Sequence, residues 1–583
     1  MHVVATAGHV DHGKSTLVRA LTGTDPDRLE EERRRGLSIE LGYAWTVLPG
    51  LPDDGEVAFV DVPGHERFLA TTLSGVGPVP VAMLIVAADD PWMPQAAEHL
   101  AALDALGVHD GLVVVTRADL ADPAPALARA RAEVDRTSLA GAPALAVSGR
   151  TGAGLDELRD TLTEVLLRTP PPDPEADVRL WVDRRFHVRG AGTVVTGTLP
   201  AGSLTPGDTL AVAGPDGDEA TVRVRSLEAL GRPRERVTGV ARVALDLGGH
   251  APDLLGRGVP LVTPGAFLPT TVVDVRLVGE GRVPQRPVLH LGSALVGTHA
   301  RPLGKDFYRL TLNEPLPLRI GDRAVLRDPG SRTLWGATVI DPRPPGLGRR
   351  GAAARRADAL LGHDGTLAAE LRLRGVVRRR LLRRIGAPLA PVPAGALEVG
   401  DWLVGPEAAA TLRARLSALV EEAGHDGVPS AAAANELRLP DPALVDALVE
   451  EPLVVAGGRV RVARAGLPRE LAEPLGRLRR HLADQPFAAP TAEELERLGL
   501  TPAVVATLRR DGHVLRPAPG IVLLADAADR AVDRLRELPQ PFTTSQARQA
   551  LGTSRRVALP LLAHLDSTGR TLRLPDDTRR LRG

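Results

Sequence analysis

The 583-residue chain contains no cysteine. It therefore has no disulfides, no thiolate metal ligands and no cysteine nucleophile, which fits a reducing compartment. Aromatic residues make up only 2% of the chain, so its hydrophobic cores must be built mainly from Leu, Val and Ala. An excess of either charge is also missing. Because 72 basic residues balance 72 acidic ones, any nucleic-acid partner must be bound by a local patch.

Long hydrophobic runs are absent as well. The longest, residues 79–88, contains Pro80 and is too short to span a bilayer. An apolar segment and a glycine-containing loop begin almost at Met1, which is unlike a secretion signal. We therefore expect a cytoplasmic protein with no membrane partner. Hydrophobic residues (43%) and charged residues (25%) are at the levels typical of globular proteins, and the length suits roughly four domains.

Two proline-rich segments, 168–174 and 341–346, divide the chain and predict semi-rigid linkers. Before the first, apolar runs alternate with helical patterns, which predicts an α/β domain with a mostly parallel sheet. Between the two linkers, short strands separated by Gly, Pro and Asp turns predict two all-β barrels. After the second, helices followed by short β-like pairs repeat at about 55–60 residues and predict four winged-helix (α+β) modules. The predicted domains are 1–170 (α/β), 175–263 and 268–342 (barrels), and 349–408, 409–466, 467–526 and 527–583 (winged helices).

The motif Gly8-His9-Val10-Asp11-His12-Gly13-Lys14-Ser15 has the form of a phosphate-binding P-loop. The apolar run 3–6 predicts a strand before it, and residues 16–21 predict a helix after it. In this context, backbone N–H groups and the helix N-terminus bind phosphates. Lys14 is expected to reach the outer phosphates, and the Ser15 hydroxyl to complete a magnesium site.

Polar residues also follow three later apolar runs. Asp61, after 57–60, can hold magnesium through water, and Gly64 lets backbone N–H approach a γ-phosphate. Asp119 can accept two hydrogen bonds from a guanine edge, and Ser148-Gly149-Arg150 can place a backbone N–H on the guanine carbonyl. Each residue alone also fits a solvated strand end, but their order at successive strand ends favours a guanine-nucleotide site. The predicted phosphate-binding residues are Gly8, His9, Val10, Asp11, His12, Gly13, Lys14, Ser15, Thr16 and Gly64.

The P-loop and Asp61-Val62-Pro63-Gly64-His65-Glu66 together resemble translational GTPases of the elongation factor Tu class. The intervening segment, 21–42, resembles the bacterial selenocysteine-specific elongation factors in particular. The resemblance covers the first domain and both barrels, and extends to the C-terminal modules through their architecture. It implies a GTPase that binds GTP and Mg²⁺, selenocysteinyl-tRNA, an mRNA hairpin and the ribosome, and acts as a monomer.

The resemblance also implies roles for single residues. Ser38 stands where the family usually has a magnesium-binding Thr, so the predicted metal residues are Ser15, Ser38 and Asp61. His65 falls on the histidine that orients the attacking water, and Val10 and Leu37 match the apolar pair that screens that histidine. The side chains of His9 and His12 are expected to support the loop rather than do chemistry.

The guanine motif departs from the family's Asn-Lys-x-Asp pattern, because this chain has Thr116-Arg117-Ala118-Asp119. Asp119 keeps the carboxylate that selects guanine, and Arg117 can lay a planar cation and its stem over the base. Thr116 lacks the amide of Asn, which puts the tether between this loop and the P-loop in doubt. Guanine specificity with weaker binding or faster nucleotide exchange is therefore expected. The predicted guanine-binding residues are Thr116, Arg117, Asp119, Ser148, Gly149 and Arg150.

In the first barrel, Asp183, Arg184 and Arg242 fall where the family's selenocysteine pocket is expected. A selenol is largely ionised near neutral pH, so two guanidinium groups would favour it over the hydroxyl of serine. Asp183 would hold the aminoacyl amine or orient an arginine. Alternatively, these residues are a strand-end pair and a solvated arginine of the barrel.

The last module, residues 541–583, contains eight Arg and three Asp. Arginines near a helix start suit phosphate contacts with structured RNA, and the resemblance implies an mRNA hairpin. A basic module that is merely soluble is the alternative. The predicted hairpin-binding residues are Gln546, Arg548, Ser554, Arg555, Arg556, Arg570 and Arg573.

Two other function classes remain open from the sequence. A GTPase subunit of a metabolic complex, such as the sulfate-adenylylation type, would share the first domain and barrels but would not use tandem winged helices. A winged-helix transcription regulator would share the tail but would not need Lys14 and His65.

Overall fold

The computed structural model describes residues 1–27, 38–90, 92–188, 192–213, 219–248, 254–331, 333–463 and 467–582. The chain forms two compact units, Met1–Ala418 with Ser430–Leu448, and Leu419–Pro429 with Val449–Gly583. Each unit is described separately below. Within the described ranges, no helix has both the length and the apolar content needed to cross a membrane.

The first unit begins with a six-stranded sheet of order β2-β3-β1-β4-β5-β6. Only β2 pairs antiparallel, with β3, and the other neighbours are parallel. The strands are β1 (His2–Gly8), β2 (Gly42–Val47), β3 (Glu56–Asp61), β4 (Val81–Ala87), β5 (Asp110–Thr116) and β6 (Ala144–Ala146). The helices are α1 (Lys14–Thr22), η1 (Asp53–Gly55), η2 (Glu66–Phe68), α3 (Leu69–Val76), α4 (Pro94–Leu106), α5 (Ala124–Val134) and α6 (Leu155–Arg168).

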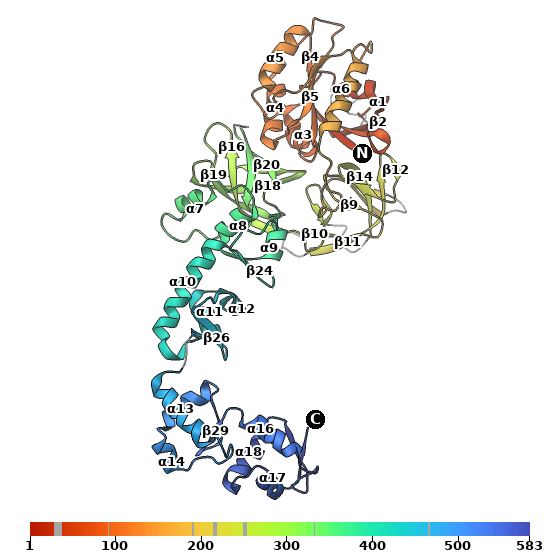
Figure 1. The fold of residues 1–583 in the computed structure, drawn as a ribbon. Coiled ribbons are helices and arrows are strands. Elements are labelled where there is room, and N and C mark those ends of the chain that lie inside the picture. Colours follow the sequence, from red (N-terminus) through yellow and green to blue (C-terminus); the bar gives the residue numbers. More distant parts are fainter. Residues whose placement is uncertain are drawn as a thin grey trace. The chain divides into compact units, whose positions relative to one another are not determined.

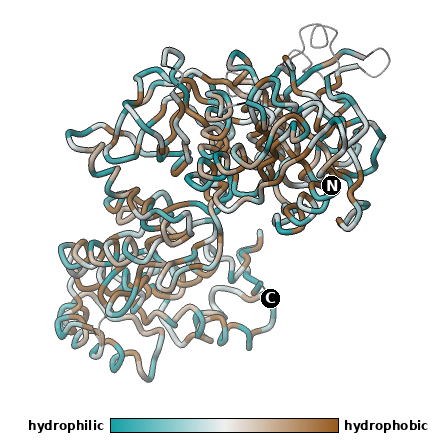
Figure 2. Tube along the Cα trace, turned by 90° about the horizontal axis from the view of Figure 1, so that it is seen from above, coloured by the Kyte–Doolittle hydropathy of each residue, from teal (hydrophilic) through white to brown (hydrophobic). Residues whose placement is uncertain are grey.

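Both faces of this sheet are buried, which explains why its central strands are continuous apolar runs. Helices α3, α4 and α5 pack on one face and α1 and α6 on the other, each over its own hydrophobic core (Figure 1). Figure 2 shows the hydrophobic segments running through the interior of this part, close to the N-terminus. The carboxyl ends of β1, β3, β4 and β5 therefore meet at one edge, where the P-loop lies.

Two antiparallel six-stranded barrels follow. The first closes in the order β10-β15-β7-β8-β14-β11 and back to β10, and the second in the order β16-β19-β18-β17-β20-β21. The first barrel region contains β7 (Arg179–Val188), β8 (Gly192–Leu199), β9 (Ser203–Leu204), β10 (Thr209–Ala213), β11 (Glu219–Ala229), β12 (Arg232–Pro233), β13 (Val237–Thr238), β14 (Ala241–Gly248) and β15 (Pro260–Val262). The second contains β16 (Pro269–Val278), β17 (Val288–Leu291), β18 (Ala294–Gly304), β19 (Phe307–Pro317), β20 (Arg323–Arg327) and β21 (Leu334–Asp341).

The first unit continues with helices and a three-stranded sheet of order β22-β24-β23. Its elements are α7 (Ala352–Leu360), α8 (Leu367–Arg374), β22 (Val376–Arg378), α9 (Arg379–Arg384), β23 (Leu397–Val399), β24 (Trp402–Val404), the start of α10 (Pro406–Ala423), α11 (Ser430–Leu437) and α12 (Ala443–Leu448). Buried ion pairs join this part to the second barrel, because Arg356 bonds both Asp274 and Asp341, and Asp274 also accepts from Arg309.

The second unit contains two successive sets of three helices and a hairpin over one continuous hydrophobic core. The first set is α13 (Arg469–His481), α14 (Ala492–Arg497), α15 (Pro502–Arg510), β28 (Val514–Ala518) and β29 (Ile521–Leu524). The second is α16 (Ala527–Arg536), α17 (Thr544–Ala550), α18 (Arg555–Ser567), β30 (Thr571–Arg573) and β31 (Arg579–Leu581). Before them lie η4 (Gly424–Asp426), β25 (Val428–Pro429), β26 (Leu453–Ala456) and β27 (Arg459–Val462).

The predicted fold class is confirmed: an α/β domain, two all-β barrels and C-terminal winged-helix structure. The predicted domain limits stay predictions. One of them, the second winged-helix module at 409–466, is divided between the two compact units.

Candidate functional site

The P-loop leaves β1 with a tight approach to the neighbouring strand. Gly8 has φ 138°, and a Cβ there would lie 2.1 Å from the carbonyl oxygen of Ile85, so only glycine fits. The buried Lys14 at the start of α1 donates from Nζ to the carbonyls of Gly8 (3.2 Å) and His9 (2.7 Å). The ammonium is thus held at the mouth of the loop, where the outer phosphates of a nucleotide would lie.

A cavity of about 440 Å³ opens in front of this loop. It brings together residues from four of the predicted motifs, with Gly64 close enough to the loop that a Cβ would lie 2.5 Å from the Val10 nitrogen. The lining residues are Val10, Asp11, Gly13, Lys14, Ser15, Thr16, Leu17, Asp27, Ser38, Gly64, Thr116, Arg117, Asp119, Leu120, Gly149 and Arg150.

The three predicted metal residues lie together at one end of the cavity. Ser15 Oγ donates to the buried Asp61 (2.7 Å) and lies 3.2 Å from Ser38 Oγ. Ser38 in turn donates to Asp27 (2.8 Å), an oxygen donor that the sequence analysis missed. Burial raises the pKa of Asp61, while nearby Lys14 opposes that rise. A set of hydroxyl and carboxylate oxygens is the ligand chemistry that Mg²⁺ prefers.

At the other end, Thr116 ties the guanine motif to the P-loop. Its hydroxyl donates to the His12 carbonyl at 2.7 Å and lies 3.2 Å from that of Val86. The doubt raised about this tether is therefore not supported, since a threonine hydroxyl replaces the amide of asparagine.

Arg117 also differs from the sequence-based expectation. Its guanidinium donates to the Asp89 carboxylate (3.1 and 3.2 Å) and to the Asp11 carbonyl, so it is held at the cavity edge by two partners. A cation bound in this way is not free to lie over a base, and only its stem remains available for that contact. Asp89 lies just after β4, and no sequence motif marked it.

Asp119, Gly149 and Arg150 line the same end of the cavity. Ser148 is buried directly before them and accepts a hydrogen bond from the Thr151 nitrogen (3.1 Å), which holds the loop. The predicted guanine-binding residues are thus brought together.

Asp119→Asn is expected to lower GTP affinity by at least about 100-fold, since two hydrogen bonds to a charged group contribute about 3 kcal/mol or more. Affinity for xanthosine triphosphate should rise, because its base offers the complementary acceptor. Equilibrium binding of fluorescent nucleotides measures both. Asp156→Asn, in an exposed side chain of α6, is the control, and unchanged GTP binding in Asp119→Asn would refute the assignment.

The predicted catalytic histidine lies beside the cavity rather than in its lining. His65 Nδ1 accepts from the Arg67 nitrogen (3.2 Å), and its ring lies 6.1 Å from that of Phe68. Val10 lines the cavity, whereas Leu37 lies outside the described residues.

A second histidine, which the sequence did not predict, forms a hydrogen bond to the start of the P-loop. The buried His99 of α4 accepts at Nδ1 from the Gly8 nitrogen (3.0 Å). Burial, with Lys14 and His9 nearby, lowers its pKa to about 3. The folded protein thus holds His99 neutral, whereas the unfolded chain protonates it below about pH 6.5.

Acidification should therefore destabilise the fold. The unfolded state binds more protons between pH 6.5 and about 3, so stability falls as the pH drops, by about 2 kcal/mol at pH 5 from His99 alone. Thermal unfolding at pH 7.5 and pH 5 should show a smaller loss of Tm in His99→Gln than in the parent. The exposed His109→Gln should match the parent. Equal losses in all three proteins would contradict this role.

The three predicted pocket residues of the first barrel also lie together. Arg242 on β14, whose side chain is 11% exposed, donates to Asp183 on β7, with one contact of 2.7 Å, and Thr196 donates to the same carboxylate (2.7 Å). Arg184 bonds the Leu41 carbonyl and pairs with Glu40 (3.0 Å). The alternative of a solvated Arg242 is thus excluded by its burial.

Tyr43 of β2 completes this cluster, and sequence reasoning missed it. The guanidinium carbons of Arg242 and Arg184 lie 4.1 and 5.2 Å from its ring centroid. Burial raises the pKa of the Tyr43 hydroxyl, so it stays protonated. A cavity of about 220 Å³ borders Tyr43, Arg184 and Arg242, where the α/β domain meets the barrel. No local motif signals Tyr43, because it comes from another domain.

The predicted hairpin-binding residues divide into two groups. Arg556 donates to the carbonyls of Ala489 (2.6 Å) and Gly520 (3.2 Å), Arg570 pairs with Asp529, and Arg573 with Asp577. Gln546 caps α17 together with Thr543. Arg548, Ser554 and Arg555 have no side-chain hydrogen bond or ion pair to any described residue, so they are available to a partner.

Comparisons with known proteins agree with this organisation. Residues 1–168 match the model of the elongation factor Tu GTP binding domain, and residues 533–581 match that of the elongation factor SelB winged helix. The chain is 40% identical over 356 residues to the selenocysteine-specific elongation factor of Escherichia coli, covering 60% of this chain and 56% of that one. It is 36% identical over 329 residues to the translation initiation factor 2 gamma subunit of Natronomonas pharaonis, covering 52% and 75%.

The matched stretch thus spans about half the length of the selenocysteine-specific relatives. A crystal structure of a bacterial selenocysteine-specific elongation factor, EF-Sec, matches over 100% of both chains, with a TM-score of 0.73 and 25% identity. A GTPase subunit of a metabolic complex would lack the C-terminal winged helices, and a winged-helix transcription regulator would lack the GTP-binding domain. The chain therefore belongs to the translational GTPases, and among them it is similar to the bacterial selenocysteine-specific elongation factors of the SelB type.

Proposed function

We propose that this protein binds GTP and selenocysteinyl-tRNA, recognises an mRNA hairpin and delivers selenocysteine to the ribosome at a UGA codon, hydrolysing GTP. The observation that carries the proposal is the buried cluster of Asp183, Arg242 and Tyr43, with Arg184 beside it, at the junction of the GTP-binding domain and the first barrel. A cationic pocket in that position suits an aminoacyl group that carries negative charge.

In this proposal the cavity at the P-loop holds GTP. Lys14 and the loop N–H groups bind the phosphates, and Asp119 reads the guanine edge. Ser15, Ser38 and Asp61 would hold Mg²⁺, which offsets phosphate charge when bound. Their hydroxyl and carboxylate oxygens fit that ion.

For hydrolysis, His65 would orient the attacking water. It acts by position rather than as a strong base, since the transition state needs aligned groups and electrostatic support. Its ring lies beside the cavity and not in its lining, so a rotation towards the γ-phosphate is part of the proposal. Contact with the ribosome would favour that rotation.

The barrel pocket would select selenocysteine by charge. Arg242 is held by Asp183 on one side and by the Tyr43 ring on the other, so its guanidinium is preorganised. An ionised selenol can form a charge-assisted contact with this guanidinium. A neutral serine hydroxyl would gain much less binding free energy from the same contact. Tyr43 and Glu40 belong to the GTP-binding domain and contact the arginines of the pocket. A change in that domain between its GTP and GDP states would therefore alter the pocket directly.

For the RNA contact, Arg548 and Arg555 are the proposed anchors, in the last turn of α17 and at the first residue of α18. The double variant Arg548→Glu/Arg555→Glu is expected to weaken hairpin binding at least 10-fold, because each lost phosphate contact costs about 1 kcal/mol or more. The affinity should also depend less on salt concentration. GTP binding should not change.

Filter binding with labelled hairpin RNA measures this effect, with Arg536→Glu, an exposed ion-paired residue, as the control. These substitutions are preferable to truncation after residue 540. The last two helix–hairpin sets share one core, and Thr553 bonds the Phe487 carbonyl, so truncation would also disrupt the preceding set. Equal RNA affinity in the double variant and the parent would reject these anchors.

A further inference from the structure

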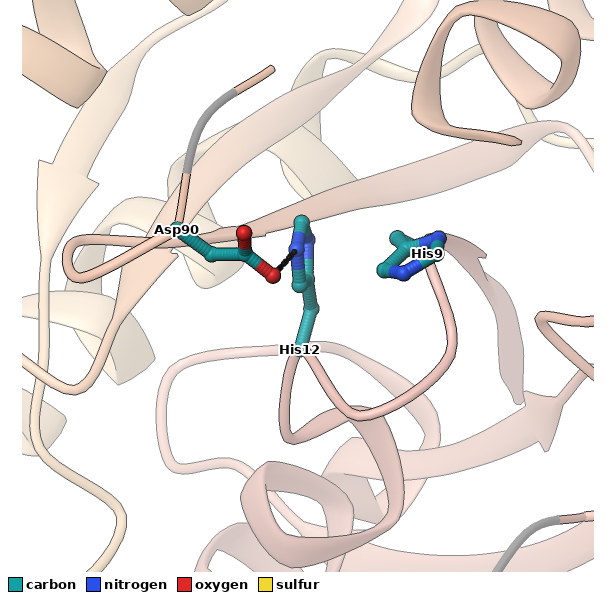
Figure 3. Close-up of side chains that lie close together, drawn as sticks. All are labelled: His9, His12 and Asp90. Atoms are coloured by element: carbon teal, nitrogen blue, oxygen red, sulfur yellow. Dashed lines mark hydrogen bonds and ion pairs between the residues drawn. The ribbon is translucent and has the colours of Figure 1, made fainter. Parts of the chain in front are cut away.

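Behind the phosphate loop lies a cluster of three side chains, none of which lines the nucleotide cavity. His9 and His12 come from the loop between β1 and α1, and Asp90 comes from the turn after β4. Figure 3 shows the His12 ring lying between the Asp90 carboxylate and the His9 ring. One ring nitrogen or carboxylate oxygen from each residue lies within 4.8 Å of the other two.

Two nitrogens in this cluster have no partner. His12 is only 1% exposed and its Nε2 lies 3.2 Å from Asp90 Oδ2. The Nδ1 atoms of both His9 and His12 are buried without a hydrogen bond in the part of the chain that the structure describes. An unpaired buried polar atom costs about 1–3 kcal/mol, and an ion bound at Nδ1 of His9 would remove that cost for His9.

The protonation state of the rings suits metal binding. Burial lowers the pKa of both histidines, so each ring is neutral near pH 7. With its proton on Nδ1, His12 presents the lone pair of Nε2 on the side of Asp90, 3.2 Å from Oδ2, which is close to the separation of two ligand atoms on one ion. A neutral imidazole with a free lone pair is the commonest metal ligand in proteins.

We propose that His9, His12 and Asp90 bind a divalent transition-metal ion, Zn²⁺ in the first place, at a site separate from that for Mg²⁺. Two imidazoles and one carboxylate favour Zn²⁺ over Mg²⁺, and leave a fourth position for water. Around a tetrahedral ion with bonds of about 2.0 Å, ligand atoms lie about 3.3 Å apart. The cluster must therefore close by about 1.5 Å at most, by rotation of the less buried His9 and Asp90.

Such an ion would act on the guanine motif through the loop backbone. The His12 carbonyl accepts from Thr116 and the Asp11 carbonyl from Arg117, so the segment between the two ligands holds the loop that contacts the base. Clamping this segment opposes separation of the two loops. Bound Zn²⁺ is therefore expected to slow the release of GDP.

Titration of the full-length protein with Zn²⁺ in saturating Mg²⁺, and with Co²⁺ as a spectroscopic probe, tests the site. One equivalent should bind, with visible Co²⁺ absorption of tetrahedral type. His9→Gln, His12→Gln and Asp90→Asn should each weaken binding at least about 10-fold, while His109→Gln, in an exposed histidine, should match the parent. Equal affinity in His9→Gln and the parent, or no Co²⁺ spectrum, would overturn the proposal.

His9→Gln is the decisive variant, because His9 is the less buried histidine and its replacement should leave the fold intact by circular dichroism. Release of a fluorescent GDP analogue gives a second readout. Zn²⁺ should slow release several-fold in the parent and not in His9→Gln, and equal effects would contradict the coupling. None of these measurements involves tRNA, so their outcome is independent of the delivery function.

Discussion

Lys14→Ala is expected to lower GTP affinity by about 1000-fold. Two charge-assisted hydrogen bonds to the phosphates contribute about 2 kcal/mol each, and about 4 kcal/mol corresponds to that factor. The ammonium is already positioned, since it is buried and bonded to the Gly8 and His9 carbonyls. Titration with a fluorescent GTP analogue measures the loss.

The chain has only one other lysine, Lys305, which provides a matched control. Its side chain is 55% exposed and lies 3.9 Å from Asp358. Lys305→Ala should bind GTP like the parent. Circular dichroism shows whether Lys14→Ala keeps its fold, and a folded variant with GTP affinity within 10-fold of the parent would refute the role of Lys14.

Arg242→Ala is expected to reduce the preference for selenocysteinyl-tRNA over seryl-tRNA by about 100-fold, as one buried charge-assisted contact contributes about 3 kcal/mol. The substitution also leaves the buried Asp183 without its charged partner, which costs stability. Arg242→Lys separates the two effects. It keeps the charge but loses the paired contact with Asp183, so it should recover stability and only part of the preference.

Arg185 lies on β7, two residues after Asp183, with an exposed side chain, so Arg185→Ala is the control. Competition binding of the two charged tRNAs in the presence of GTP gives the preference directly. An equal loss of affinity for both tRNAs in Arg242→Ala would contradict selection by charge.

The fold was largely predictable because its signals are local. Apolar runs such as 82–86 and 112–115 are buried on both faces and became β4 and β5. The nucleotide cavity was predictable for a related reason. In a parallel sheet, neighbouring strand ends meet at one edge, so Asp61 and Asp119 had to approach the P-loop.

Contacts between distant segments were not predictable in the same way. Tyr43 reaches the barrel pocket from β2, and no spacing in the sequence links it to Arg242. Asp89, just after β4, accepts hydrogen bonds from Arg117. It lies at a strand end, like Asp61 and Asp119, but belongs to no recognised motif. Arg556 has the character of an RNA contact in the sequence, yet the structure uses it to bind backbone carbonyls of the preceding helix–hairpin set.

The decisive measurement is the affinity of the full-length protein for selenocysteinyl-tRNA and seryl-tRNA, each with GTP and with GDP. A selenocysteine-delivering factor should bind selenocysteinyl-tRNA at least about 100-fold more tightly than seryl-tRNA with GTP, and should lose most of that affinity with GDP. Equal affinity for the two tRNAs, or an affinity that does not depend on the nucleotide, would contradict the proposed function.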